Sequence, residues 1–208
     1  MGKLMKKDSS VDIVYNYIKE QIAKNAIFPG NSIVEEDLAQ KTGVSRISVR
    51  GALTRLYYEG YIESRPNHSA KLIAPSKADM TDIFEARLTV ESRADALALK
   101  NKTPAQIRRI KALLEEEEKI GASFSVPDYV RINRELHFEM INGCGNPYYI
   151  KFLNEIYNKC DIYLLFFDRS QTNEASKKTH RKLVEAFLSD DEQGIAEALK
   201  EDFGLVTF

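Results

Sequence analysis

The chain has 208 residues, which is enough for two domains, one of about 70–80 residues and one of about 130. Hydrophobic residues make up 43% and charged residues 29%, a balance that is typical of globular proteins and excludes an intrinsically disordered chain. The longest strongly apolar run, residues 162–167, is far too short to span a bilayer, and residues 1–10 lack the apolar core of a secretory signal. Cys144 and Cys160 do not form a CxxC pair, which favours reduced thiols over a zinc cluster or a disulfide framework. We therefore expect a cytoplasmic protein with no membrane partner.

The formal net charge of −1 conceals a difference between the two parts of the chain. Residues 1–78 carry 12 Lys and Arg against 8 Asp and Glu, whereas the remaining residues carry 18 against 23. A basic N-terminal module on an acidic body suits a nucleic-acid partner, because contacts to phosphate supply most of the affinity of such proteins.

The first 75 residues combine three helical patterns with a hairpin pattern. Apolar residues recur at helical spacing, and Phe28-Pro29-Gly30 and Thr42-Gly43-Val44 supply turns between the helices. Two short extended segments around a polar turn predict a β-hairpin after the third helix. The expected elements are helices over residues 12–24, 33–41 with Ser32 as cap, and 46–59 with Ser45 as cap, followed by strands over 61–64 and 71–73. This is the order of a winged helix-turn-helix, in which the helix after the short turn is the recognition helix.

The expected recognition helix divides into a packing face and a polar face. The packing face is formed by Val49, Leu53 and Leu56. Arg46 and Arg50 are four residues apart and therefore share the other face, and Ser45 and Ser48 place two hydroxyls in the same turn. Guanidinium groups and hydroxyls bind phosphates and base edges, so this face predicts contact with double-stranded DNA. The alternative is a small helical domain whose basic face contacts only solvent.

Several motifs of this module resemble the winged helix-turn-helix of the GntR family of bacterial regulators. They are Phe28-Pro29-Gly30, Glu36-Asp37-Leu38-Ala39, Gly43-Val44-Ser45-Arg46, Val49-Arg50-Gly51-Ala52-Leu53 and Leu56-Tyr57-Tyr58-Glu59-Gly60. The resemblance implies that Arg46, Ser48 and Arg50 contact an operator, with Ser45 beside them. It also implies a contact from His68 at the tip of the wing to the minor groove. The sequence departs from the family at Ile47-Ser48, where Thr-Pro is common, at Gly51, where Glu is common, and at Ser69, where Gly is common.

Six further helices are predicted after Pro75, with no strand pattern among them. N-cap residues, and Pro at first helical positions, recur at their starts. The helices begin after Ser76, Thr103, Ser125 and Asn146, near Asn173 and after Asp190, and they end near Lys100, Ile120, Asn142, Asp168, Ser189 and Phe203. Short loops predict an antiparallel bundle whose interior can hold a ligand. The expected fold is mainly α, with a winged helix-turn-helix (three helices plus a β-hairpin) over residues 1–75 and an antiparallel six-helix bundle over residues 76–208.

Polar residues on inward-facing positions of this bundle are candidate metal ligands. His137 follows Asn133 by one turn on the third bundle helix, and His180 and Asp202 lie on the fifth and sixth. Imidazole and carboxylate are common ligands for first-row metals, although a single histidine on an amphipathic helix is more often hydrogen-bonded or exposed. The charge run over residues 115–118, by contrast, is expected to be a solvated helix face.

The bundle resembles the FCD effector domain of the FadR-type subgroup of GntR regulators over about residues 78–208. The resemblance rests on residues 84–88 with Glu91, on residues 133–137, on Gly145-Asn146-Pro147 and on His180. Many members bind a divalent metal through Asp or Asn and three His. The ligands that this implies here are Asn133, His137, His180 and Asp202, so a carboxylate replaces the final imidazole, and the metal would be zinc, manganese or nickel. The alternative is a pocket in which these residues only hydrogen-bond one another.

Arg87 is the expected effector-binding residue. In the FCD family the matching Arg often points toward a carboxylate ligand, and the guanidinium group suits a small acid. The alternative is an exposed ion pair with Glu91, four residues later, which would be worth about 0.2–0.5 kcal/mol.

These features predict a homodimeric, ligand-responsive DNA-binding transcription regulator and not an enzyme. Two recognition helices spaced about one turn of DNA apart require a dimer on an inverted repeat. We expect a repressor that a small carboxylate metabolite releases by shifting the population of head arrangements. Two alternatives stay open. One is a metal-dependent enzyme housed in the bundle, for which no general base or nucleophile is found at a defined spacing, and the other is a ligand-independent DNA-binding protein.

Overall fold

The computed structural model describes residues 8–64, 69–120, 125–167 and 173–204. The chain divides into two compact units, Met1–Ala74 and Pro75–Phe208. None of the helices in the described residues is long and apolar enough to cross a membrane.

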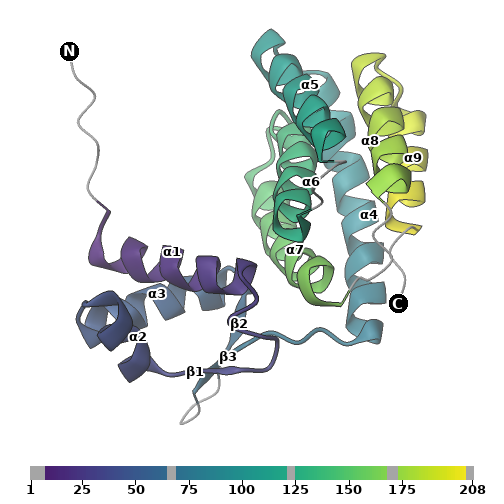
Figure 1. Ribbon diagram of the computed structural model, residues 1–208. Coiled ribbons are helices and arrows are strands. Elements are labelled where there is room, and N and C mark those ends of the chain that lie inside the picture. Colours follow the sequence, from purple (N-terminus) through teal and green to yellow (C-terminus); the bar gives the residue numbers. More distant parts are fainter. Residues whose placement is uncertain (1–7, 65–68, 121–124, 168–172, 205–208) are drawn as a thin grey trace, which may run out of the picture. The chain divides into compact units, whose positions relative to one another are not determined.

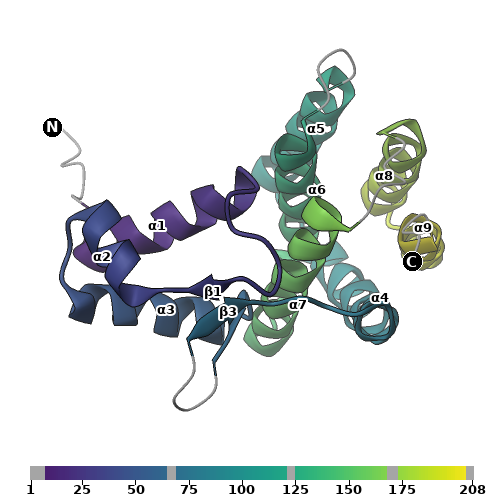
Figure 2. The same ribbon diagram turned by 60° about the horizontal axis from the view of Figure 1, so that its bottom comes forward.

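The described residues of the first unit form three helices and a small sheet (Figure 2). The helices are α1 (Ser10–Ala23), α2 (Glu35–Thr42) and α3 (Arg46–Tyr58), and the strands are β1 (Ser32–Ile33), β2 (Ile62–Glu63) and β3 (Ala70–Leu72). β3 lies between β1 and β2 and pairs antiparallel with both. The core, where α1 packs on α3, includes the fully buried Val14, Ile18, Val49 and Leu56. The predicted winged helix-turn-helix is confirmed, with β1 as a strand that the sequence pattern does not predict.

Ser32 does not cap α2, so the predicted Ser32 cap is wrong. The backbone of Ser32 pairs with Lys71 in the sheet instead, and the helix begins at Glu35. Val34, at the N-cap position, supplies no side-chain hydrogen bond. The first turn of α2 is acidic, and its negative charges stabilise the positive end of the helix dipole. A two-residue strand that pairs with a partner far along the chain leaves no local signal, which explains the error.

Two residues determine the turn between α2 and α3. Gly43 ends α2 with a φ of 69°, a left-handed backbone in which glycine has no steric penalty. Ser45 caps α3 as predicted, because its Oγ accepts a hydrogen bond from the backbone N–H of Ser48 at 3.3 Å. α1 crosses α3 closely at Gly51, where a Cβ atom would lie 3.1 Å from the Val11 side chain. The Glu that is common in the GntR family at this position would therefore require the Val11 side chain to move by a few tenths of an ångström.

The described residues of the second unit form six helices and no strand (Figure 1). They are α4 (Lys77–Leu99), α5 (Pro104–Lys119), α6 (Val126–Ile141), α7 (Pro147–Phe166), α8 (Asn173–Leu188) and α9 (Glu192–Gly204). Side-chain caps are confirmed at Ser76, Thr103, Ser125 and Asn146. The predicted Asp190 cap is wrong by one residue. Asp190 has a left-handed backbone with a φ of 61°, and Asp191 accepts the hydrogen bond from the Gly194 N–H at 2.9 Å.

α4 packs against α6, α7 and α9. Its buried face starts with apolar residues, Met80 and Phe84, and continues with the ionisable residues Arg87, Glu91 and Asp95. Charged side chains are almost never fully buried unless they are paired. Arg87, Glu91 and Asp95 therefore need partners in the bundle interior, and the candidate site lies beside them.

Candidate functional site

The exposed face of α3 carries the two arginines that are predicted to contact DNA. Their partners are acidic residues of the first turn of α2: Arg46 Nη2 lies 2.8 Å from Glu36, and Arg50 Nε lies 2.9 Å from Glu35. Exposed ion pairs of this kind are worth only about 0–1 kcal/mol. Phosphates or base edges can therefore replace these carboxylates at low cost.

The two predicted serines lie at the N-terminal end of the same helix. The Oγ atoms of Ser45 and Ser48 are 3.1 Å apart, and backbone N–H groups in the first turn of a helix attract phosphate. α3 thus brings four of the five predicted DNA contacts together at one end. The fifth, His68, lies outside the described residues, and its role stays a prediction.

Arg87 is buried and paired, unlike the exposed ion pair that its spacing from Glu91 would suggest. Only 2% of Arg87 is exposed, and its Nε donates to the Glu91 carboxylate at 2.7 Å. The aromatic rings of Phe203 and Tyr157 flank it, with ring centroids 4.3 and 4.8 Å from Cζ. Burial alone would lower the pKa of Arg87, but the Glu91 charge outweighs this effect and raises it. The guanidinium group is therefore a permanent buried cation whose anion is already supplied by α4.

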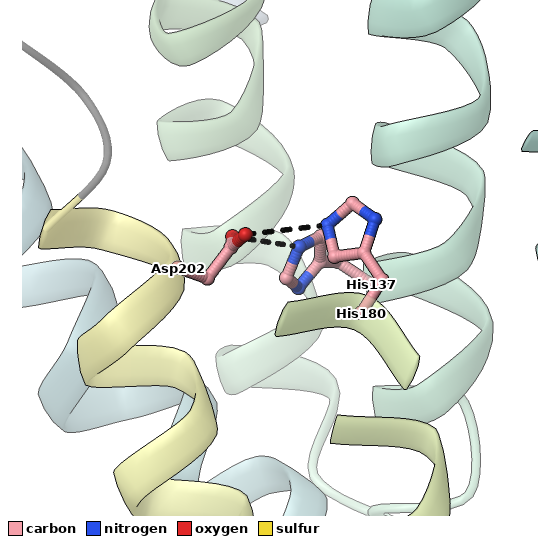
Figure 3. A group of neighbouring side chains, drawn as sticks. All are labelled: His137, His180 and Asp202. Atoms are coloured by element: carbon pink, nitrogen blue, oxygen red, sulfur yellow. Dashed lines mark ion pairs between the residues drawn. The ribbon is translucent and has the colours of Figure 1, made fainter. Parts of the chain in front are cut away.

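Three of the four predicted metal ligands converge in the bundle interior (Figure 3). His137 extends from α6, His180 from α8 and Asp202 from α9. The Asp202 carboxylate lies 3.5 Å from the Nε2 atoms of both histidines, and one ligand atom from each residue lies within 4.8 Å of the others. This group could hold a metal ion.

Each histidine is oriented by a buried glutamate. Glu91 Oε1 lies 2.6 Å from His137 Nδ1, and Glu117 Oε1 lies 2.7 Å from His180 Nδ1. Burial alone would raise the pKa of Glu91, but the charges of Arg87 and His137 outweigh it and lower the pKa to about 2. A carboxylate can only accept, so the His137 Nδ1–H must donate to it. This arrangement directs Nε2 toward the other ligands, as in the carboxylate–histidine–metal triads of metalloproteins.

The two distances from Asp202 to the histidines suit a small divalent metal. Ligand atoms about 2.0–2.2 Å from a tetrahedral metal are about 3.3–3.6 Å from each other, close to the two Nε2–Asp202 distances of 3.5 Å. Neither Nε2 atom has a hydrogen-bond partner among the described residues, although both are buried. Buried nitrogen atoms are rarely left without a partner, so a cation at this position would satisfy both.

Protons compete with a metal for these imidazoles. Burial alone would lower the pKa of His180, but the charges of Glu117 and Asp202 outweigh it and raise the pKa to about 10. Burial would raise the pKa of Asp202, but His180 and His137 hold it well below the ordinary value. A metal ion must therefore displace a tightly held proton from His180.

Asn133 and Glu117 are two further buried polar residues of the bundle. Asn133, the fourth predicted ligand, is buried on α6 one turn before His137, and its role as a ligand stays a prediction. Glu117 belongs to the acidic run that predicts a solvated face, yet it is fully buried, so this expectation is wrong for Glu117. Its signal is the helical spacing from Ile110 and Leu113, which places it on the packing face of α5.

Comparisons with known proteins identify both units. The FCD domain matches residues 82–204, and the family described as bacterial regulatory proteins, gntR family, matches residues 11–72. The Escherichia coli (strain K12) HTH-type transcriptional regulator McbR is 24% identical over 192 residues, which cover 90% of this chain and 86% of that protein. The uncharacterized HTH-type transcriptional regulator YdhC of Bacillus subtilis (strain 168) is 24% identical over 175 residues, which cover 82% of this chain and 77% of YdhC.

Solved structures share the fold. The structure of E. coli McbR/YncC superposes with a TM-score of 0.80 at 22% identity and covers 95% of each chain. A putative transcriptional regulator GntR from Rhodococcus sp. RHA1 gives a TM-score of 0.78 at 16% identity and also covers 95% of each chain. The FCD match spans more than half of the chain, and the matched families are transcription regulators rather than enzymes. The chain therefore belongs to the GntR family of DNA-binding transcription regulators, in the FadR-like subgroup that carries an FCD domain.

Proposed function

We propose that this regulator is a homodimeric repressor that binds an inverted-repeat operator and is released by a small carboxylate metabolite. The observation that carries the DNA-binding part is the exposed end of α3, where Arg46 and Arg50 stand beside the cap formed by Ser45 and Ser48. Residues near the N-terminus of a recognition helix reach base edges, and the flanking groups bind phosphate. The assigned operator contacts are Ser45, Arg46, Ser48, Arg50 and, from the wing, His68.

In the bundle, the proposal assigns a divalent metal to Asn133, His137, His180 and Asp202. Three imidazole or carboxylate donors and one amide oxygen suit zinc, manganese or nickel. A bound metal would supply a Lewis acid for the carboxylate of the effector. Arg87 would contact the same carboxylate, but only in competition with Glu91, to which it already donates at 2.7 Å.

Arg50→Ala tests the DNA-binding assignment. We expect it to weaken specific operator binding by about 1–3 kcal/mol for each half-site, since a well-placed bidentate arginine contributes that much discrimination. The measurement is a gel-shift titration at fixed salt, with an operator selected from genomic fragments that the full chain retains. Arg108→Ala is the matched control, because it removes the same charge from an exposed position on α5. Equal affinities of Arg50→Ala and Arg108→Ala would refute the assignment of Arg50.

The dimer is tested by sedimentation velocity of the full chain. An inverted repeat requires two recognition helices, so we expect a species of twice the chain mass of 23.7 kDa, both free and on a full operator. A single chain bound to one half-site, with no second binding event on the full operator, would contradict the proposed symmetry.

A further inference from the structure

The most exposed large apolar side chain among the described residues belongs to the recognition helix. Ile47 is 83% exposed and is the second residue of α3. The other large apolar side chains above 70% exposure are tyrosines, Tyr58 and Tyr148, whose hydroxyl groups keep contact with water. Ile47 has no such polar group, so its exposure is not explained by the fold of the free chain.

The neighbours of Ile47 on α3 are polar residues that suit DNA. Arg46 precedes it, Ser48 follows it, and Arg50 lies one turn later on the exposed face. The buried face of the helix is separate and includes Val49, where the side chain is fully buried. Ile47 thus lies among the groups assigned to phosphates and base edges, although it can bind neither through a hydrogen bond.

The major groove offers one apolar group on its floor, the C5-methyl group of thymine. We propose that Ile47 is a specificity-determining residue that packs against the methyl group of a thymine in each operator half-site. The contact distinguishes T·A from C·G pairs, because cytosine lacks the methyl group. This inference rests on the proposed operator binding through α3 and adds the identity of one base that the helix recognises.

The test removes the methyl group without changing base pairing. Each thymine of the selected operator is replaced in turn, in both half-sites, by deoxyuridine. At one symmetric position we expect the affinity of the unmodified full chain to fall about fourfold for each half-site, or about fifteenfold for both, as burial of one methyl-sized group predicts. Hydrogen-bond donors and acceptors are the same in the two duplexes, so a loss reports the methyl contact alone.

Ile47→Ala completes a double-mutant cycle at that position. The variant should bind the thymine operator more weakly and should bind the thymine and deoxyuridine duplexes equally, because the methyl group has lost its partner. Ile13→Ala is the control, since it removes the same side chain from an exposed position on α1 and should keep full sensitivity to deoxyuridine. Because Ile47 is exposed, Ile47→Ala should fold normally and keep the circular dichroism spectrum of the unmodified chain. The deoxyuridine series uses the unmodified chain, so it tests the contact even if the variant fails to fold.

Two results would overturn this inference. One is an operator at which no deoxyuridine substitution changes the affinity of the unmodified chain. The other is an Ile47→Ala variant that keeps the full sensitivity to deoxyuridine. Both leave operator binding intact, whereas a chain that retains no specific DNA would refute the proposed function itself.

Discussion

Glu91→Ala should lower the free energy of unfolding by about 3–5 kcal/mol, because it leaves an uncompensated charge in the bundle interior. Glu91 accepts from Arg87 at 2.7 Å and faces His137 Nδ1 at 2.6 Å, and all three residues are buried. Removing the carboxylate leaves the Arg87 cation against aromatic rings and without its hydrogen-bonded anion. Burying an unpaired guanidinium group is one of the few mechanisms by which a single substitution has so large an effect.

Urea unfolding followed by circular dichroism measures this loss. Glu85→Ala is the matched control, since Glu85 lies on an exposed position of the same helix and should change stability by less than about 0.5 kcal/mol. A joint replacement of Arg87 and Glu91 by leucine should recover most of the loss, because apolar residues can replace a buried pair at little cost. A Glu91→Ala variant as stable as Glu85→Ala would show that Arg87 does not depend on this partner.

The stabilisation by a divalent metal should increase with pH. The pKa of His180 is raised to about 10, so its protonated form contributes stability that is fully present below about pH 6.5 and is lost as the pH rises through about 10. Metal binding requires the neutral imidazole and therefore releases this proton. Apparent metal affinity should rise about tenfold per pH unit for each proton displaced, and the rise should continue above about pH 7.5, where an ordinary histidine is already neutral.

Calorimetric titration of the metal-stripped chain with zinc, manganese and nickel, at several pH values between 6.5 and 8.5, measures this dependence. Thermal unfolding with and without the metal should show a shift of the midpoint that grows over the same range. His137→Ala combined with His180→Ala should abolish both effects. Metal uptake that is independent of pH would contradict the displaced proton, and no uptake of any of the three metals would leave a purely hydrogen-bonded site.

Local signals in the sequence predict most of the fold. The caps at Ser45, Ser76 and Thr103 are confirmed, because a cap depends on a side chain and a backbone N–H three residues later. β1 and the place of Ser32 within it could not be predicted, because the strand exists only through pairing with β3. Helical spacing can be read from neighbouring residues, whereas strand pairing joins residues far apart in the sequence. The error at Ser32 arises from such a distant pairing.

The sequence predicts the three residues that converge in the candidate site, but not the residues that support them. The resemblance to FCD domains identifies His137, His180 and Asp202, which the structure brings together. The spacing of Arg87 and Glu91 predicts an ion pair, but its burial depends on rings from other helices, which local spacing cannot show. Glu117 lies in a run of four acidic residues, which predicts a solvated face, whereas its helical spacing from Ile110 and Leu113 predicts burial.

The ion pairs between α2 and α3 have a consequence for how the regulator discriminates among DNA sequences. In the free chain, Glu35 pairs with Arg50 and Glu36 pairs with Arg46, as phosphate groups of DNA would. In the proposed DNA complex, a duplex exchanges these carboxylates for its own oxygen atoms, and its backbone charge then lies close to two released acidic groups. A random sequence offers only phosphates in return, whereas an operator adds base contacts. The exchange cost is small for each exposed pair and is the same for every sequence, so the acidic turn of α2 should lower the affinity for all DNA alike. Discrimination between operator and genomic background then rests on the base contacts alone.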